Sequence, residues 1–342
     1  MKTKHFLLSG LALATPLLLS MDPRGDSVTF APAEGSTLSK TYVVTQKFTL
    51  DDMTMAMNGE EMDPAMMGVD LDEASGEVSA TLEFTDEYVA MDGARHKELK
   101  RTFGSMVAEY ATGDGESGSE SNDEMEGKTI VFKLDAESGE YALTDGDGEE
   151  IDEEMQILSV DTDLTVFLPA GEVEEDASWT IEGADLMRVF VPGVNIDKAM
   201  AKLDEEASKN DAPFAPSDFM DFMGELGSIE CTYKGTKEVE GTTLQVISLV
   251  PTLEKEIDLT DMISEIIDMS APGQDISASA SITLEGTGSG ELLWDAKAGH
   301  FVEYTLDIQI SALITGSGES QGMGGGIEVE TTTNLGYHFT AK

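Results

Sequence analysis

Apolar and polar residues alternate over short stretches along most of the chain, which is the pattern of β-strands that bury one face. Residues 41–50 are an example, with Tyr42, Phe48 and Leu50 all at even positions. The stretches are rich in Thr, Val and Ile and end at Gly, Asp or Asn, as strands joined by hairpins do. Further strands are predicted over 78–84, 129–134, 140–144, 164–168, 179–182, 229–234, 243–250, 277–284, 290–294, 301–310 and 326–340.

Helical periodicity is confined to three short segments. Residues 196–208 follow Asn195, a good helix cap, and repeat apolar residues on one helical face. Two more helices are predicted over 218–226 and 261–269, after Ser217 and Thr260. Strands and helices do not alternate regularly, which argues against a parallel α/β fold.

These patterns predict a mainly β protein with minor α structure. We expect two antiparallel β-rich parts, of the curved-sheet or half-barrel type, joined by a short helical insert. The pattern leaves open whether the two parts form one sheet or two domains. The predicted organisation is a signal peptide (1–20), a lead-in (21–40), an acidic β-rich part (41–194), a helical insert (195–227) and a second β-rich part (228–342).

One eight-residue pattern occurs twice. Residues 134–141 and 294–301 both run large apolar, Asp, Ala, variable, small, Gly, polar, aromatic, and a weaker copy begins at Asp72. In a hairpin the Asp would accept backbone N–H bonds and the Gly would take the left-handed conformation. Two related halves and two independent hairpins both fit this pattern.

The N-terminus has the layout of a secretory signal peptide, because Lys2 and Lys4 precede an apolar run over 6–19. Cleavage after Ala14 fits the small-residue rule, but we favour cleavage after Ser20, which removes the whole run. No cysteine lies near either site, which argues against a lipoprotein anchor. No later segment approaches the length of a membrane span, so we expect an exported chain, periplasmic or extracellular, without a transmembrane anchor.

Charge excludes several classes of partner. The 342 residues include 68 Asp and Glu against 20 Lys and Arg, a net charge of −48. Such a surface repels nucleic acid and anionic membranes and suits salty surroundings. The one basic cluster, 95–101, is expected to pair with the protein's own carboxylates.

Two segments are weak candidates for metal sites. Asp145, Asp147, Glu149 and Asp152 resemble a calcium loop, but Glu150 and Gln156 occupy positions where an EF-hand needs Gly and Glu. Met53, Met55 and Met57 would share one strand face, where thioethers could bind Cu⁺. We favour a solvated acidic hairpin and an ordinary core strand, with no cofactor expected, and keep Ca²⁺ or Cu⁺ as alternatives.

No catalytic constellation is found. Cys231 lies in an alternating strand pattern and is expected to be a buried apolar residue. Residues 318–322 match the spacing of a nucleophile elbow but lie in a glycine-rich segment, predicted as a loop over 315–326, without the required helix. Because the chain has 68 acidic residues, no particular pair of carboxylates stands out as a catalytic acid and base. A hydrolase is therefore a lesser alternative.

The order of turn and packing motifs resembles a family of uncharacterised exported β-rich bacterial proteins, a domain of unknown function. The motifs are Glu126–Ile130, Leu168-Pro169, Asp176–Trp179, Tyr233, Gly288–Gly290, Trp294-Asp295 and Gly299. Some such proteins are similar in fold to envelope carriers of lipids or lipoproteins, in which a curved sheet cups a hydrophobic ligand. The resemblance implies a binding role and brings no catalytic residues.

We therefore expect an exported, strongly acidic, non-catalytic protein that binds or scaffolds an unknown partner in the envelope or extracellular space. One alternative is a carrier of a hydrophobic or lipid ligand in a concave sheet. A second is a protein that binds a divalent cation or Cu⁺.

Overall fold

The computed structural model describes residues 25–67, 71, 73–209, 226–270, 276–320 and 323–342. It confirms a mainly β fold with minor α structure and a large, open antiparallel sheet. The predicted signal peptide (1–20), the start of the lead-in, and the predicted helix over 218–226, except Leu226, lie outside the described residues.

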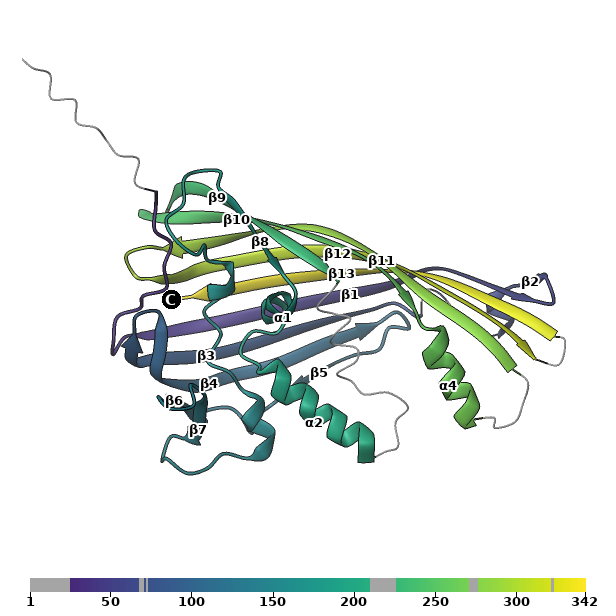
Figure 1. Ribbon diagram of the computed structural model, residues 1–342, viewed down its shortest axis with the longest axis horizontal. Helices are drawn as coiled ribbons and strands as arrows, with labels where there is room; N and C mark the ends of the chain where they lie inside the picture. Colours follow the sequence, from purple (N-terminus) through teal and green to yellow (C-terminus); the bar gives the residue numbers. More distant parts are fainter. Residues whose placement is uncertain (1–24, 68–70, 72, 210–225, 271–275, 321–322) are drawn as a thin grey trace, which may run out of the picture.

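The thirteen described strands form one sheet, drawn in Figure 1. They are β1 (Thr37–Met57), β2 (Glu60–Met62), β3 (Gly76–Asp92), β4 (Arg95–Thr112), β5 (Ser117–Ser121), β6 (Thr129–Leu134), β7 (Tyr141–Asp145), β8 (Ser178–Glu182), β9 (Gly227–Val239), β10 (Thr242–Asp258), β11 (Ile276–Asp295), β12 (His300–Ser320) and β13 (Met323–Ala341). The main order is β7-β6-β4-β3-β1-β13-β12-β11-β10-β9-β8, with β2 beside β1 and β5 beside β4.

The first and the last long strands meet in the middle of this sheet, because β1 pairs with β13 from Lys40 to Met57. The two predicted β-rich parts therefore join in a single sheet rather than folding apart. The first part supplies one side of this seam, and the second part supplies the other side.

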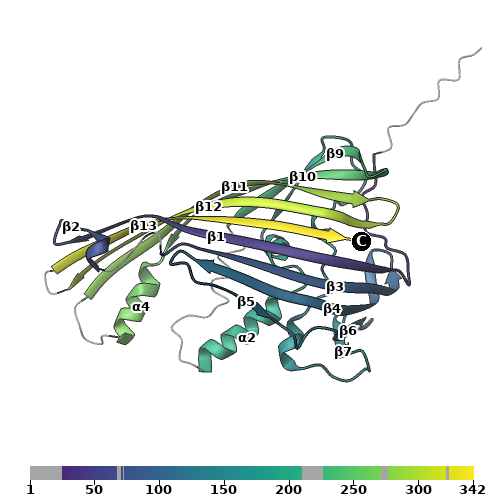
Figure 2. The same ribbon diagram turned by 180° about the vertical axis from the view of Figure 1, so that it is seen from behind.

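The connection from β7 to β8 joins opposite edges of the sheet, so residues 146–177 must cross one of its faces. We call these residues the crossing segment, and the face they cover the inner face. Two helices, α2 (Ile196–Lys209) and α4 (Thr260–Ser270), lie on the same side of the sheet in both views (Figures 1 and 2). Helix α1 (Ala184–Phe190) packs into the core through the buried side chains of Leu186 and Val189.

The core lies between the crossing segment and one half of the inner face. Tyr42 and Phe339, on neighbouring strands, stack with ring centroids 4.0 Å apart. Phe167 of the crossing segment and Leu186 of α1 are fully buried against this cluster. Val28 is also buried, so part of the predicted lead-in belongs to the core rather than to a loose leader.

The strand predicted over 164–168 is wrong. Leu164 has the left-handed backbone conformation, with φ of 55°, and Thr165–Phe167 forms a short 3-10 helix. Leu164 and Phe167 are buried in the crossing segment, so this apolar run fills the core without belonging to the sheet.

Several strands are longer than the sequence predicts. The stretches over 277–284 and 290–294 are one strand, β11. The glycine-rich segment over 315–326, predicted as a loop, mostly continues β12 and β13, and Gly316 pairs with Ile327. Residues 113–126, whose acidic, Gly- and Ser-rich composition predicts a mobile loop, include strand β5. Strand β4 was not predicted, because its Arg and Lys residues mask the alternation.

Two predicted helices are confirmed, as α2 and α4. Asn195 caps α2, since its Oδ1 accepts the backbone N–H of Lys198 at 3.1 Å. At α4 the capping acceptor is Asp258 Oδ1, at 2.9 Å from the backbone nitrogen of Thr260, and not Thr260 itself. Helix α1 was not predicted.

Both copies of the repeated pattern form the hairpin turn that the sequence predicts. In each copy the Asp side chain, Asp135 or Asp295, accepts two backbone N–H bonds at 2.8–3.0 Å. Gly139 and Gly299 both have positive φ, at 76° and 73°. Asp72 of the weaker copy lies outside the described residues.

Candidate functional site

Four buried charged side chains meet on the inner face of β1, β3 and β4. Lys40 Nζ donates hydrogen bonds to Asp86 at 2.8 Å, to Asp163 at 2.7 Å and to Thr162 Oγ1 at 2.9 Å. Arg101 binds the Asp86 carboxylate through Nε at 2.7 Å and Nη2 at 3.1 Å. Two cations and two anions thus neutralise one another inside the protein.

Three rings complete this group. Tyr88 Oη donates to Asp163 at 2.6 Å, and His96 Nε2 lies 3.1 Å from the other oxygen of that carboxylate. Tyr42 Oη donates to the backbone carbonyl of Thr162. We call these residues the buried ionic cluster: Lys40, Tyr42, Asp86, Tyr88, His96, Arg101, Thr162 and Asp163.

Opposing effects set the pKa values of the two carboxylates. Burial alone would raise the pKa of Asp86, but the charges of Arg101 and Lys40 outweigh it and lower the pKa. Burial also opposes ionisation of Asp163, and Lys40 and His96 again hold its pKa well below the usual range. Burial raises the pKa of Tyr88, and the Asp163 charge raises it further. Both carboxylates therefore stay ionised at neutral pH.

The buried ionic cluster fixes the crossing segment to the sheet. Asp163 and Thr162 belong to the crossing segment, whereas Lys40 and Arg101 belong to the sheet. Arg101 also donates to the backbone carbonyls of Ser159 at 2.9 Å and of Val160 at 3.2 Å. These contacts confirm that the basic segment over 95–101 pairs with the protein's own groups.

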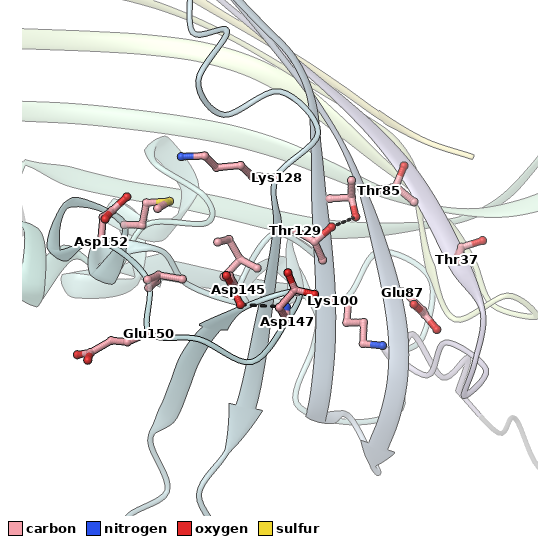
Figure 3. Close-up of a pocket in the computed structure, with 15 residues that line it drawn as sticks. Thr37, Thr85, Glu87, Lys100, Lys128, Thr129, Asp145, Asp147, Glu150 and Asp152 are labelled. Atoms are coloured by element: carbon pink, nitrogen blue, oxygen red, sulfur yellow. Dashed lines mark hydrogen bonds between the residues drawn. The ribbon is translucent and has the colours of Figure 1, made fainter.

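The predicted acidic loop lines an open cleft of about 990 Å³ beside β3, β4 and β6 (Figure 3). Asp145, Asp147 and Asp152 line it, whereas Glu149 does not. Asp145 Oδ1 accepts the backbone N–H groups of residues 147 and 149 at 2.9 and 2.8 Å, which is a hairpin role. Asp152 stands apart from Asp145 and Asp147 in Figure 3.

Within the described part of the chain, no three His, Cys, Asp or Glu residues are grouped as metal ligands. The two alternatives, that the acidic loop binds Ca²⁺ and that the methionines bind Cu⁺, stay predictions.

Neither candidate nucleophile stands in a catalytic setting. Cys231 is fully buried, and burial raises the pKa of its thiol to about 12. Residues 318–320, predicted to lie in a loop, pair in β12 with β11 and β13, so this part of the elbow-like sequence is extended strand.

The inner face continues past the core as an apolar surface. Side chains of directly paired residues point to the same face of a sheet, so the register identifies them. One row of paired residues crosses five strands, and all its members are apolar and half-buried: Met53, Val329, Ile314, Ile282 and Ile257. We call it the apolar row.

The outer face shows the opposite chemistry at the same level of the sheet. The neighbouring row of paired residues is Thr54, Glu328, Thr315, Ser281 and Asp258. Thr315 and Ser281 exchange a hydroxyl hydrogen bond of 2.8 Å across their strands. In a sheet with one polar and one apolar face, the polar face is solvated, whereas the apolar face is usually covered by other groups.

A β-bulge brings the predicted methionines into this surface. Strict alternation from Tyr42 would place Met53, Met55 and Met57 on the outer face. The register shifts between Leu50 and Asp52, so the methionines instead pair with inner-face residues of β13. They share one face, as the sequence predicts, but on a surface that extends beyond the core.

Other large apolar side chains near this region are exposed. Met57 is 52% exposed, Val78 is 45% and Tyr110 is 43%. Val78 and Tyr110 are cross-strand partners on β3 and β4. We define the distal inner face as Leu50, Met53, Met55, Met57, Val78, Tyr110, Ile257, Ile282, Ile314, Ile327 and Val329.

Helix α4 contacts β11 at the side of this surface. Met262, Ile263 and Ile267 are half-buried, whereas Asp261 and Ser264 are exposed. The helix thus has its apolar side against the protein, and it leaves the members of the apolar row on β1, β12 and β13 half-exposed.

Sequence reasoning found some residues of this surface but not their arrangement. Ile282 and Val329 lie in predicted strands, whereas Ile257 and Ile314 lie outside every predicted strand. Their lateral alignment depends on the pairing of distant strands, which one sequence does not specify. The signal in the sequence was that apolar residues keep alternating along the strands for more residues than the core contains.

Neither the models of known protein families nor the curated proteins that we compared with this chain match it. None of the described helices is both long enough and apolar enough to cross a membrane.

Proposed function

We propose that this chain is an exported, non-catalytic binding protein that holds apolar groups of another molecule against the distal inner face. The apolar row is the observation that carries the proposal. Its five aligned apolar side chains are half-exposed, although a soluble protein has no need of apolar side chains at such positions. An apolar surface of this kind, next to polar ones, typically marks an interaction site.

The surrounding architecture supports a binding role. The crossing segment fills only one half of the inner face, and the buried ionic cluster fixes it there. The other half keeps its apolar surface on long, mutually paired strands, which is a rigid support for a ligand. The signal-peptide pattern over 1–20 and the net charge of −48 support a location outside the cytoplasm.

Binding of a neutral apolar dye tests the proposal. Nile red should fluoresce on adding the mature protein, because the dye leaves water for the distal inner face. Ile314→Glu places a charge in the apolar row and should abolish most of this signal.

Thr315→Glu is the matched control, because it adds the same charge one residue away on the outer face. It should keep the signal. Equal dye binding by the two variants, with circular dichroism unchanged, would show that the distal inner face is not the binding surface.

A further inference from the structure

The charge, size and flexibility of the distal inner face point to one class of occupant: we propose that it binds a basic amphipathic α-helix of a partner protein. This inference rests on the proposed function and specifies the partner.

The surface has the dimensions of a helix. The apolar row crosses five strands, β1, β13, β12, β11 and β10, which corresponds to a width of about 20 Å. The surface runs along β1 from Leu50 to Met57, a length of about 25 Å. A helix of about 17 residues is about 25 Å long and about 10 Å across with its side chains. A single acyl chain spans only about half of a 30 Å bilayer core and would leave most of this surface exposed.

The charge around the surface selects a cationic partner. The described parts of residues 48–63, 255–286 and 310–331 form this end of the sheet and α4, and the three ranges contain five, seven and three acidic residues. The one Lys, Arg or His in these three ranges is Lys255 of β10, which pairs with Leu284 on the inner face. A helix with Lys or Arg beside its apolar face complements this field, whereas an acidic helix or an anionic lipid is repelled.

The side chains suit a helical partner. Met53, Met55 and Met57 are flexible and polarisable, and such residues adapt to helices of differing sequence. The protein itself already packs a helix on this side of the sheet, because α4 lies against β11 with its apolar residues half-buried. Insertion of an apolar helix face into such a surface is a recurring mode of recognition.

Two synthetic peptides of about 18 residues test this inference. One carries Leu on its apolar face and Lys on its polar face, and the other has Glu in place of every Lys. Titration of the mature protein should show that the Lys peptide binds at least about tenfold more tightly than the Glu peptide. The Lys peptide should become helical on binding, and its affinity should fall as NaCl is raised. Ile314→Glu should remove binding, and Thr315→Glu should retain it.

Each other outcome overturns the inference in a distinguishable way. In one such outcome, the protein binds Nile red and palmitoyl lysophosphatidylcholine but neither peptide, and Ile314→Glu removes that binding. This result would leave the proposed function intact and would identify the partner as a lipid instead of a helix. Binding of the Lys peptide only by a variant lacking residues 210–225 would mean that this chain covers its own surface. Binding of the Lys peptide equally by both Glu variants would mean adhesion through charge alone. No binding of dye, lipid or peptide would end the proposed function itself.

Discussion

Lys40 is the residue on which the attachment of the crossing segment depends most. It is fully buried and is the only described cation that bridges both buried carboxylates, Asp86 and Asp163. Removing one partner of a buried pair leaves uncompensated charge, which costs more than the pair contributes.

Lys40→Met should therefore destabilise the protein by about 3–5 kcal/mol, measured by urea unfolding. Lys97→Met is the control, because Lys97 lies 3.9 Å from Asp92 with both side chains more than half exposed. Exposed pairs contribute about 0–1 kcal/mol. Similar losses in the two variants would contradict the role assigned to the buried ionic cluster.

The same cluster predicts acid sensitivity. Asp86 and Asp163 have pKa values below that of an unfolded Asp, which is about 3.9. Their contribution to stability is complete above the unfolded pKa and is lost as the pH falls toward the lower folded pKa. The free energy of unfolding should fall more steeply between about pH 5 and about pH 2 in the wild type than in Asp163→Asn. Equal slopes would mean that Asp163 does not supply this dependence.

Among the elements, the two repeated hairpins provide an internal comparison. Both Gly139 and Gly299 need positive φ, so a side chain strains either turn. At Gly299 a Cβ would also lie 2.4 Å from the backbone oxygen of Ala31, whereas at Gly139 the nearest atom is 3.8 Å away, in Arg95.

Gly139→Ala should cost about 1–2 kcal/mol from backbone strain alone. Gly299→Ala should cost clearly more, because the backbone of the N-terminal segment must also move. Urea unfolding of the two variants measures the difference. Equal losses would show that the N-terminal segment does not pack closely on this turn.

Elements whose signals are local were predictable. The Asp and Gly of the two hairpins and the Asn195 cap of α2 depend on neighbouring residues alone. Elements whose structure depends on contacts with distant parts of the chain could not be predicted. The apolar run over 164–168 looks like a strand until the crossing of the sheet is known, and the inward position of Arg101 hid β4.

The candidate site was predictable only in part, for the same reason. The sequence placed Met53, Met55 and Met57 on one face, but the bulge after Leu50 decides which face. The apolar row exists only once five strands are aligned.

For the whole molecule, the acidic residues are concentrated and not evenly spread. Residues 134–187 contain 18 Asp and Glu and no Lys or Arg. This stretch includes the whole crossing segment and the predicted acidic loop, so repulsion acts across one region of the fold.

Salt should stabilise the protein. Raising NaCl from about 0.01 M to about 1 M shortens the Debye length from about 30 Å to about 3 Å and screens this repulsion. The midpoint of thermal unfolding should rise over that range. A midpoint that stays constant or falls would contradict the interpretation of the charge as an adaptation to salty surroundings.

The most direct test of the proposed binding surface uses the methionines themselves. With ¹³C-labelled methyl groups, Met53 and Met55 report on the distal inner face, and Met155 reports on the acidic cleft. On titration with Nile red or the Lys peptide, the account predicts that the signals of Met53 and Met55 shift while that of Met155 does not. Binding that shifts Met155 and leaves Met53 and Met55 unchanged would contradict it.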